Sequence, residues 1–168
     1  MSIIRAVRGI MPVIGQNCFI AETAVVAGDV VMGDDCSIWY GAVLRGDVNS
    51  IRLGRRVNIQ DGAVLHTLYE RSVVEIGDDV SVGHNAIIHG AKIGNNVLVG
   101  MGAILMDNAV IPDNTIIAAG AVVLSNATLE PGVYAGLPAK KVKDSDEKVV
   151  EMARNNAAGY LLYKEWFI

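Results

Sequence analysis

An aliphatic residue recurs at every sixth position through most of this 168-residue chain. Glycine or alanine often follows the aliphatic residue, and a small or β-branched residue stands two positions before it. Residues two positions apart lie on the same face of an extended strand, so each six-residue unit presents one large and one small side chain inward. The aliphatic series is Ile14, Ile20, Val26, Met32, Ile38, Leu44, Leu53, Ile59, Leu65, Ile76, Val82, Ile88, Ile93, Val99, Leu105, Ile111, Ile117 and Val123.

A period of six is typical of a parallel β-solenoid in which three units form one triangular coil, and the series predicts about six stacked coils. Polar pairs such as Asp34-Asp35, Asp78-Asp79 and Asn95-Asn96 suit sharp corners, because Asp and Asn tolerate a positive φ. Hydrophobic residues make up 52% of the chain but aromatic residues only 5%, which fits many thin, similar layers. A β-sandwich would instead show strict alternation and longer loops.

The six-residue register breaks at three places. The first break, between Leu44 and Ile51, is expected to bulge at Ser50-Ile51-Arg52. The second contains a polar insert at residues 67–72, and the third shortens the unit after Ile88. Breaks in a solenoid form loops, often beside the binding face, so these three places are the first to search for a site.

Beyond residue 143 the pattern becomes helical. Asp144 and Glu147 form a capping box that predicts the start of a helix. We therefore expect a β-helix over residues 1–143 and a helix over residues 144–168 that packs on the solenoid. The apolar residues at helical spacing are Val149, Met152, Ala153, Ala157, Tyr160 and Leu161.

Composition narrows the class of protein. A net charge of −4 and a pI near 5.3 argue against nucleic acid as a partner. The first ten residues carry Arg5 and Arg8 and no long apolar run, so we expect no signal peptide, no membrane segment and a cytoplasmic location. Cys18 and Cys36 fall on the small inward position, which predicts two buried thiols rather than a disulfide.

All three histidines, His66, His84 and His89, lie in one short window flanked by the register breaks. His66 and His84 are eighteen residues apart, which is about one coil. None of the three occupies an inward position, so they point outward, where a neighbouring subunit can complete a site. Three imidazoles suit Zn²⁺, Fe²⁺ or Co²⁺ and leave a position for water. The alternative is three unrelated surface histidines, and the shared window favours the metal.

Further polar residues precede this window. Arg45 and Asp47 are two positions apart and therefore share a face, which predicts an ion pair at an interface. Gln60 and Asp61 are candidates for orienting a metal ligand or its bound water.

Together, the segments Leu44-Arg45-Gly46-Asp47, Asn58-Ile59-Gln60-Asp61, Gly83-His84-Asn85 and Ile88-His89-Gly90 resemble γ-class carbonic anhydrases and the carbonic-anhydrase-like proteins grouped with them. The resemblance covers nearly the whole chain. It implies a left-handed parallel β-helix, a homotrimer, and three metal sites at the subunit interfaces. It also implies the reversible hydration of CO₂ to bicarbonate by hydroxide on a metal, with Zn²⁺ as the first choice.

The same resemblance assigns roles to individual residues. His66 and His89 would bind the metal from one subunit and His84 from its neighbour, and Gln60 would hydrogen-bond the metal-bound water. Five further residues complete the implied site. Arg45, Asp47 and Asp61 would hold the interface and the site together. Asn58 would line the substrate pocket, and Tyr160 on the helix is a further candidate.

The chain departs from the best-characterised members of this family in one respect. Those proteins carry a long acidic loop whose glutamates shuttle protons. Here Val48 follows Asp47, and Glu70 is the one carboxylate in the short insert after His66. We expect hydration of CO₂ to be slow as a result.

Two other functions share parts of this pattern. Acyltransferases and thioesterases of the hexapeptide family act on coenzyme A substrates, and Ala135-Gly136-Leu137-Pro138-Ala139-Lys140 resembles the tail where the acyltransferases hold that cofactor. Lys140, Lys141 and Lys143 would meet its phosphates, but such enzymes need one catalytic histidine rather than three. A non-catalytic metal-binding trimer would keep the ligands for assembly alone.

Overall fold

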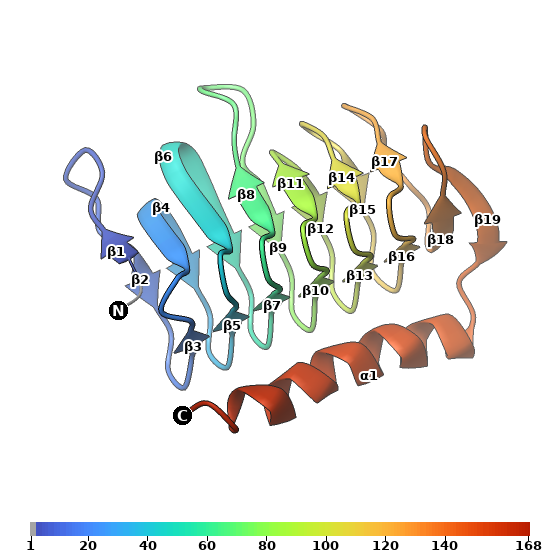
Figure 1. The fold of residues 1–168 in the computed structure, drawn as a ribbon. Helices are drawn as coiled ribbons and strands as arrows, with labels where there is room; N and C mark the ends of the chain where they lie inside the picture. The colour runs from blue at the N-terminus through green and yellow to red at the C-terminus, as the bar shows by residue number, and fades with distance from the viewer. Residues whose placement is uncertain (1–2) are drawn as a thin grey trace.

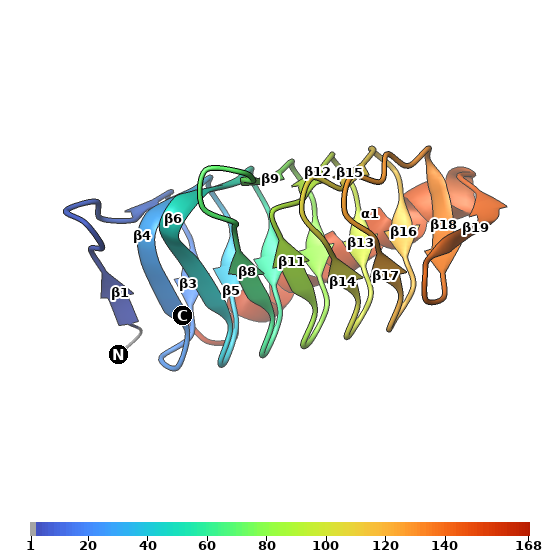
Figure 2. The ribbon, with the colours of Figure 1, turned by 90° about the horizontal axis from the view of Figure 1, so that it is seen from above.

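The computed structural model describes residues 3–168 and shows a parallel β-solenoid of about seven turns followed by one helix (Figure 1). The predicted left-handed parallel β-helix is confirmed. Successive coils stack in a row from the N-terminal end to the C-terminal end, as the view from above shows (Figure 2).

Each coil has three faces. The first face consists of β3 (Phe19–Ile20), β5 (Ser37–Ile38), β7 (Asn58–Ile59), β10 (Ser81–Val82), β13 (Leu98–Val99), β16 (Ile116–Ile117), β18 (Gly132–Ala135) and the antiparallel β19 (Lys140–Asp144). The second face consists of β1 (Ile3–Arg5), β4 (Val25–Met32), β6 (Val43–Leu53), β8 (Val64–His66), β11 (Ile87–His89), β14 (Ile104–Leu105) and β17 (Val122–Val123). The third face consists of β2 (Val13–Ile14), β9 (Val74–Ile76), β12 (Lys92–Ile93) and β15 (Val110–Ile111). The long strands β4 and β6 continue from the second face into the third and join them in one sheet.

The predicted inward positions form the core. Leu44, Leu65 and Ile88 stack in neighbouring strands of the second face and are 0% exposed. At the corners, the second residue of each polar pair takes a positive φ, as with Asp35 at 60° and Asp79 at 58°. The period of six therefore sets both the packing of the interior and the position of the turns.

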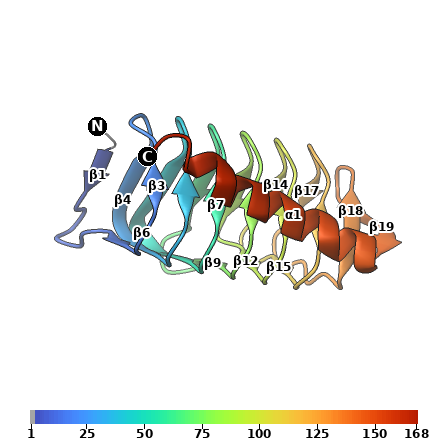
Figure 3. The same ribbon diagram turned by 90° about the horizontal axis from the view of Figure 1, so that it is seen from below.

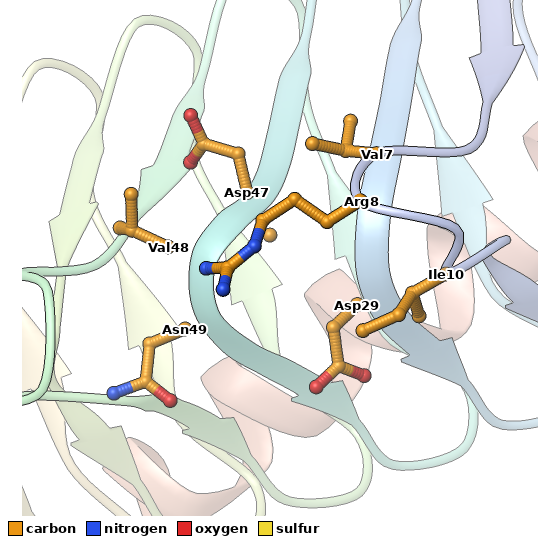
Figure 4. Close-up of a pocket in the computed structure, with 8 residues that line it drawn as sticks. Val7, Arg8, Ile10, Asp29, Asp47, Val48 and Asn49 are labelled. Atoms are coloured by element: carbon orange, nitrogen blue, oxygen red, sulfur yellow. The ribbon is translucent and has the colours of Figure 1, made fainter.

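The first register break differs from the prediction. Ile51 is buried and pairs with Val30, and the register shift lies opposite residues 47–50 of β6. The extra residues are therefore 47–50 rather than Ser50-Ile51-Arg52, because Ile51 keeps an inward position. Figure 4 shows this inserted segment beside a cleft of about 290 Å³, with the side chain of Arg8 extending toward it.

The helix α1 (Glu147–Lys164) begins three residues later than predicted. Its N-cap is Asp146, which accepts a hydrogen bond from the Val149 amide at 2.9 Å. Asp144 instead ends β19, so the predicted capping box is wrong. Asp146 directly precedes the first helical turn, so its carboxylate can accept from the unpaired amides of that turn. Asp144 lies too far before the helix to reach these amides.

Helix α1 runs back along the first face of the solenoid toward its N-terminal end (Figure 3) and contacts β5 and β10. The predicted apolar face is correct for Val149, Ala153 and Ala157, which are buried, and wrong for Met152, which is 58% exposed. The charged Lys164 is 1% exposed, which the apolar periodicity does not predict. No helix within residues 3–168 is long and apolar enough to cross a membrane.

The two cysteines are free thiols in different environments. Cys36 is fully buried, as predicted. Cys18 is only half-buried, so the prediction of a buried thiol is wrong for this residue. The first coil has one neighbouring coil fewer than those inside the stack, which leaves its side chains more accessible.

Candidate metal centre

Two of the three histidines face each other on the second face of the solenoid. His66 and His89 end the paired strands β8 and β11 in matching register. The Nδ1 atom of His66 lies 3.2 Å from the Nε2 atom of His89, and the ring planes meet at 60°. We call these two residues the histidine pair.

The outer nitrogen of each ring contacts a carboxylate. His66 Nε2 lies 3.0 Å from Asp47 Oδ1, and His89 Nδ1 lies 2.9 Å from Asp107 Oδ2. A carboxylate only accepts hydrogen bonds, so each contact holds the ring proton on the outer nitrogen. Both inner nitrogens then carry lone pairs.

Two nitrogen atoms that lie 3.2 Å apart and direct their lone pairs at each other repel unless a cation lies between them. In a tetrahedral zinc site with bonds of about 2.05 Å, two ligand nitrogens lie about 3.3 Å apart. The distance between His66 Nδ1 and His89 Nε2 fits that value. The donors present are therefore suited to a metal ion.

The two carboxylates are themselves fixed. Asp47 forms an ion pair with Arg45, as the spacing of these two residues predicts. Burial opposes ionisation of Asp47, but hydrogen bonds from Arg45 and His66 outweigh it and hold the pKa below its usual value. Asp107 is likewise desolvated, and hydrogen bonds from Ser72 and His89 keep its pKa low.

Asp107 and Ser72 were not predicted as site residues. Ser72 Oγ donates to Asp107 Oδ1 at 2.5 Å. The signal for Asp107 was present in the sequence, because it stands eighteen residues after His89, one coil further along the same face. Ser72 lies in the insert, which has no repeat register, so only the structure reveals it.

The third histidine lies elsewhere on the chain. His84 Nδ1 contacts Asp61 Oδ2 at 2.9 Å, and the His84 side chain is 40% exposed. It lines a cleft of about 290 Å³ together with Gln60 and Tyr160. The apolar part of the wall comes from Leu98, Val99, Met101 and Ala119. We call this the His84 cleft.

One chain does not assemble the three histidines. Among the side chains of residues 3–168, no three of His, Cys, Asp or Glu are grouped closely enough to hold a metal. The histidine pair and the His84 cleft are two separate clusters on a single molecule, each with its own carboxylate partners.

Gln60 is held by a buried chain of polar groups. Its Nε2 donates to Asn58 Oδ1 at 3.0 Å, and Asn58 Nδ2 donates to Ser81 Oγ at 2.8 Å. Asn58 is 1% exposed and contacts Gln60 from behind, and its place in the substrate pocket stays a prediction. Ser81 was not predicted. Within residues 3–168 no group donates to the Gln60 side-chain oxygen, which leaves it able to accept a hydrogen bond.

Tyr160 reaches the His84 cleft from helix α1. Its ring packs edge-on against Trp39, with centroids 5.4 Å apart. Burial, and secondarily the charge of Asp61, raises the pKa of Tyr160 to about 12. The hydroxyl therefore stays protonated at neutral pH and is available as a hydrogen-bond donor.

Acidic neighbours neutralise two lysines of the C-terminal tail. Lys141 Nζ lies 2.7 Å from Asp144 and 3.7 Å from Glu130, and Lys143 Nζ lies 2.7 Å from Asp146. These pairs weaken the predicted attraction for the phosphates of coenzyme A.

Comparison with known proteins places the chain in a family. Residues 11–46 and 90–125 match the bacterial transferase hexapeptide model (six repeats), and residues 73–106 match the hexapeptide repeat of succinyl-transferase. A carbonic anhydrase from Geobacillus kaustophilus is 46% identical over 149 residues, covering 88% of this chain and 81% of that protein. This chain belongs to the carbonic-anhydrase-like hexapeptide-repeat family.

Two further members of the family align along almost the whole chain. Protein YrdA of Escherichia coli is 42% identical over 173 aligned positions, covering 99% of this chain and 94% of its own. The crystal structure of a hexapeptide transferase family protein from Anaplasma phagocytophilum superposes with a TM-score of 0.92 at 36% identity, covering 99% of this chain and 98% of that one. The family therefore includes proteins named for two different reactions.

Proposed function

We propose that this protein is a γ-class carbonic anhydrase that interconverts CO₂ and bicarbonate at a metal held between two subunits. The observation that carries the proposal is the 3.2 Å approach of two histidine nitrogens whose rings are each oriented by a carboxylate. The 46% identity to a protein named as a carbonic anhydrase supports the same reaction.

The separation of the histidine pair from the His84 cleft supports a homotrimer. A contact between the histidine pair of one subunit and the His84 cleft of the next joins two different surfaces, and such contacts close into a ring when the rotation permits. A ring of three would contain three equivalent sites. The partly exposed His84 side chain is free to serve a neighbour.

His66 and His89 of one subunit and His84 of the next would hold the metal. Three imidazoles and one open position suit Zn²⁺, and the same donors accept Fe²⁺ or Co²⁺. When bound, the metal lowers the pKa of a water molecule to about 7, which makes hydroxide available at neutral pH.

The protein's own residues supply orientation and a dry surface. Asp47 and Asp107 keep each imidazole in the tautomer that presents a lone pair. Gln60, held by Asn58, offers its oxygen as the acceptor that orients a water proton. The apolar wall of the His84 cleft accommodates CO₂, which has no charge and no hydrogen-bond donor.

The proposal is tested by stopped-flow CO₂ hydration on protein loaded with Zn²⁺, and with Fe²⁺ under anaerobic conditions. We expect catalysis well above the buffer rate, its loss in His84→Ala, and no loss in Lys92→Ala, a change at an exposed surface ion pair. A fully metallated protein without hydration activity would overturn the proposal and leave a non-catalytic metal-binding trimer.

The transferase names within the family support acyl transfer or thioester hydrolysis on coenzyme A as the second candidate. Calorimetric titration with coenzyme A distinguishes it from the first. We expect no binding, because Lys141 and Lys143 are already paired with carboxylates. Saturable binding that weakens in Lys141→Ala would favour the transferase function.

A further inference from the structure

The two cysteines occupy the same position in consecutive coils. Cys18 precedes β3 and Cys36 precedes β5, eighteen residues later. The strands β3 and β5 pair in parallel, and the Phe19 amide donates to the Cys36 carbonyl at 2.9 Å. Neighbouring strands lie about 4.8 Å apart, which falls within the Cα separation of about 4.4–6.8 Å that a disulfide requires.

The side chains of the two cysteines also point the same way. The Cys18 thiol lies 3.3 Å from the Gly33 carbonyl oxygen, and the Cys36 thiol lies 3.2 Å from the equivalent Gly54 oxygen of the following coil. Equivalent positions on paired parallel strands therefore stack the two thiols in consecutive coils.

A buried ammonium group lies beside this pair. Lys164 Nζ, from the end of α1, donates to the Asn17 carbonyl at 2.5 Å and lies 3.4 Å from Asp35 Oδ1. Its two partners are the residues that directly precede Cys18 and Cys36. Positive charge near a thiol favours the thiolate, which is the reactive form.

The two thiols differ in acidity and in access. The hydrogen bond from Cys36 is the main cause that lowers the pKa of Cys18 to about 7, with a further contribution from Lys164 and opposition from burial and Asp34. Contact with Cys18 and burial raise the pKa of Cys36. Only Cys18 is partly exposed, so a reagent from solvent meets Cys18 first.

We propose that Cys18 and Cys36 form a peroxide-reactive dithiol in which Cys18 is attacked first and Cys36 resolves it. The Cys18 thiolate attacks one oxygen of hydrogen peroxide, the O–O bond breaks, and the sulfenic acid forms with release of hydroxide. The Cys36 sulfur then attacks the Cys18 sulfur, the S–O bond breaks, and water leaves. Two thiols and one peroxide thus give one disulfide and two waters, with the sulfurs oxidised and the peroxide reduced.

The reaction is measured on the intact protein by mass spectrometry after one equivalent of peroxide. We expect the loss of two hydrogen atoms in mass, reversed by a thiol reductant. Trypsin leaves both cysteines in one peptide, residues 9–45, and cleavage at Glu22 separates them. Digestion with trypsin and a glutamate-specific protease should yield residues 9–22 joined to residues 23–45 through the disulfide.

Variants test the order of attack and the role of the charge. In Cys36→Ser, peroxide should leave Cys18 as a sulfenic acid that a dimedone probe captures, whereas Cys18→Ser should leave Cys36 unmodified. The alkylation rate of Cys18 should rise through a midpoint near pH 7 in the native protein. Lys164→Met should slow alkylation at pH 7 several-fold, and Lys164→Arg should restore it.

Three results would overturn the proposal. The first is a Cys18 midpoint at the ordinary thiol value of about 8.5. The second is peroxide oxidation that ends in sulfinic acid without a disulfide. The third is modification of Cys36 in Cys18→Ser at the rate of the native pair, which would show that access is not limited to Cys18.

Discussion

Asp107 accepts one hydrogen bond from His89 at 2.9 Å and another from Ser72 at 2.5 Å. Because this carboxylate sets the tautomer of a proposed ligand, Asp107→Ala should weaken Zn²⁺ affinity about 10- to 100-fold. Asp113→Ala is the matched control, since that carboxylate accepts from the Asn95 amide at a coil corner and contacts no histidine. Competition with a chromophoric chelator measures both. Equal affinity in Asp107→Ala and the native protein would contradict the role given to Asp107.

Ser81 is the buried end of the chain that holds Gln60. Ser81→Ala removes the acceptor of Asn58 Nδ2, so Gln60 loses its fixed orientation. We expect kcat for CO₂ hydration to fall about tenfold while metal content stays unchanged. Ser37→Ala is the control, because Ser37 lies one coil before Asn58 and its hydroxyl accepts a hydrogen bond from Trp39 Nε1. If Ser81→Ala and Ser37→Ala have the same kcat, the orienting role of Ser81 is excluded.

Proton release should depend on buffer. Glu70 is the one carboxylate of the 67–72 insert and lies exposed at its turn, as a solvated loop charge would. Hydration turnover should therefore rise with imidazole buffer concentration, and Glu70→Gln should not change that dependence. Turnover that is independent of buffer in the native protein and slow in Glu70→Gln would identify Glu70 as an internal shuttle.

The contact between Lys164 and Asp35 should make stability depend on acid pH. The Asn17 amide is the main cause that lowers the pKa of Asp35, burial opposes it, and Lys164 adds to it. Because the pKa of Asp35 is lower in the folded state than in the unfolded state, ionised Asp35 stabilises the fold. This stabilisation is complete above about pH 4 and is lost as the pH falls through the folded-state pKa.

Lys164→Met should therefore lower the free energy of unfolding by about 1–3 kcal/mol at pH 7, and the difference from the native protein should narrow toward pH 3. Urea denaturation at both pH values and one protein concentration measures it. The Lys143→Met variant removes an exposed ion pair and should show a smaller loss. A difference between Lys164→Met and the native protein that does not change with pH would contradict the ion-pair contribution.

The repeat determines how much of the fold the sequence predicts. Inward residues such as Leu65 and Ile88 could be identified because their spacing is set by strand alternation and by the corners. The predicted position of the bulge differs from the observed one at residues 47–50 because the six-residue period gives no information where it breaks. Only the pairing with β4 shows which residues of β6 remain in register. The burial of Lys164 could not be predicted, because its partners, Asn17 and Asp35, are far away in sequence.

The site divides in the same way. The eighteen-residue spacing predicted His84 as the neighbour of His66 in the stack, and this prediction is wrong. His66 pairs with His89, 23 residues later, because the polar insert lengthens that coil. Asp107 follows the eighteen-residue coil and was within reach of that count. The link from Gln60 through Asn58 to Ser81 depends on side-chain directions inside one corner, which repeat spacing does not specify.

The most direct test of the proposed metal site shared between subunits mixes two variants that should each be inactive. His84→Ala keeps the histidine pair, and His66→Ala keeps the His84 cleft, so neither homotrimer contains a complete site. If subunits exchange at random, about one quarter of the interfaces in an equal mixture should combine an intact pair with an intact His84. We predict that co-refolding recovers about a quarter of the native zinc content and CO₂ hydration. No recovery from the refolded mixture, or full metal binding by either variant alone, would contradict a site shared between subunits.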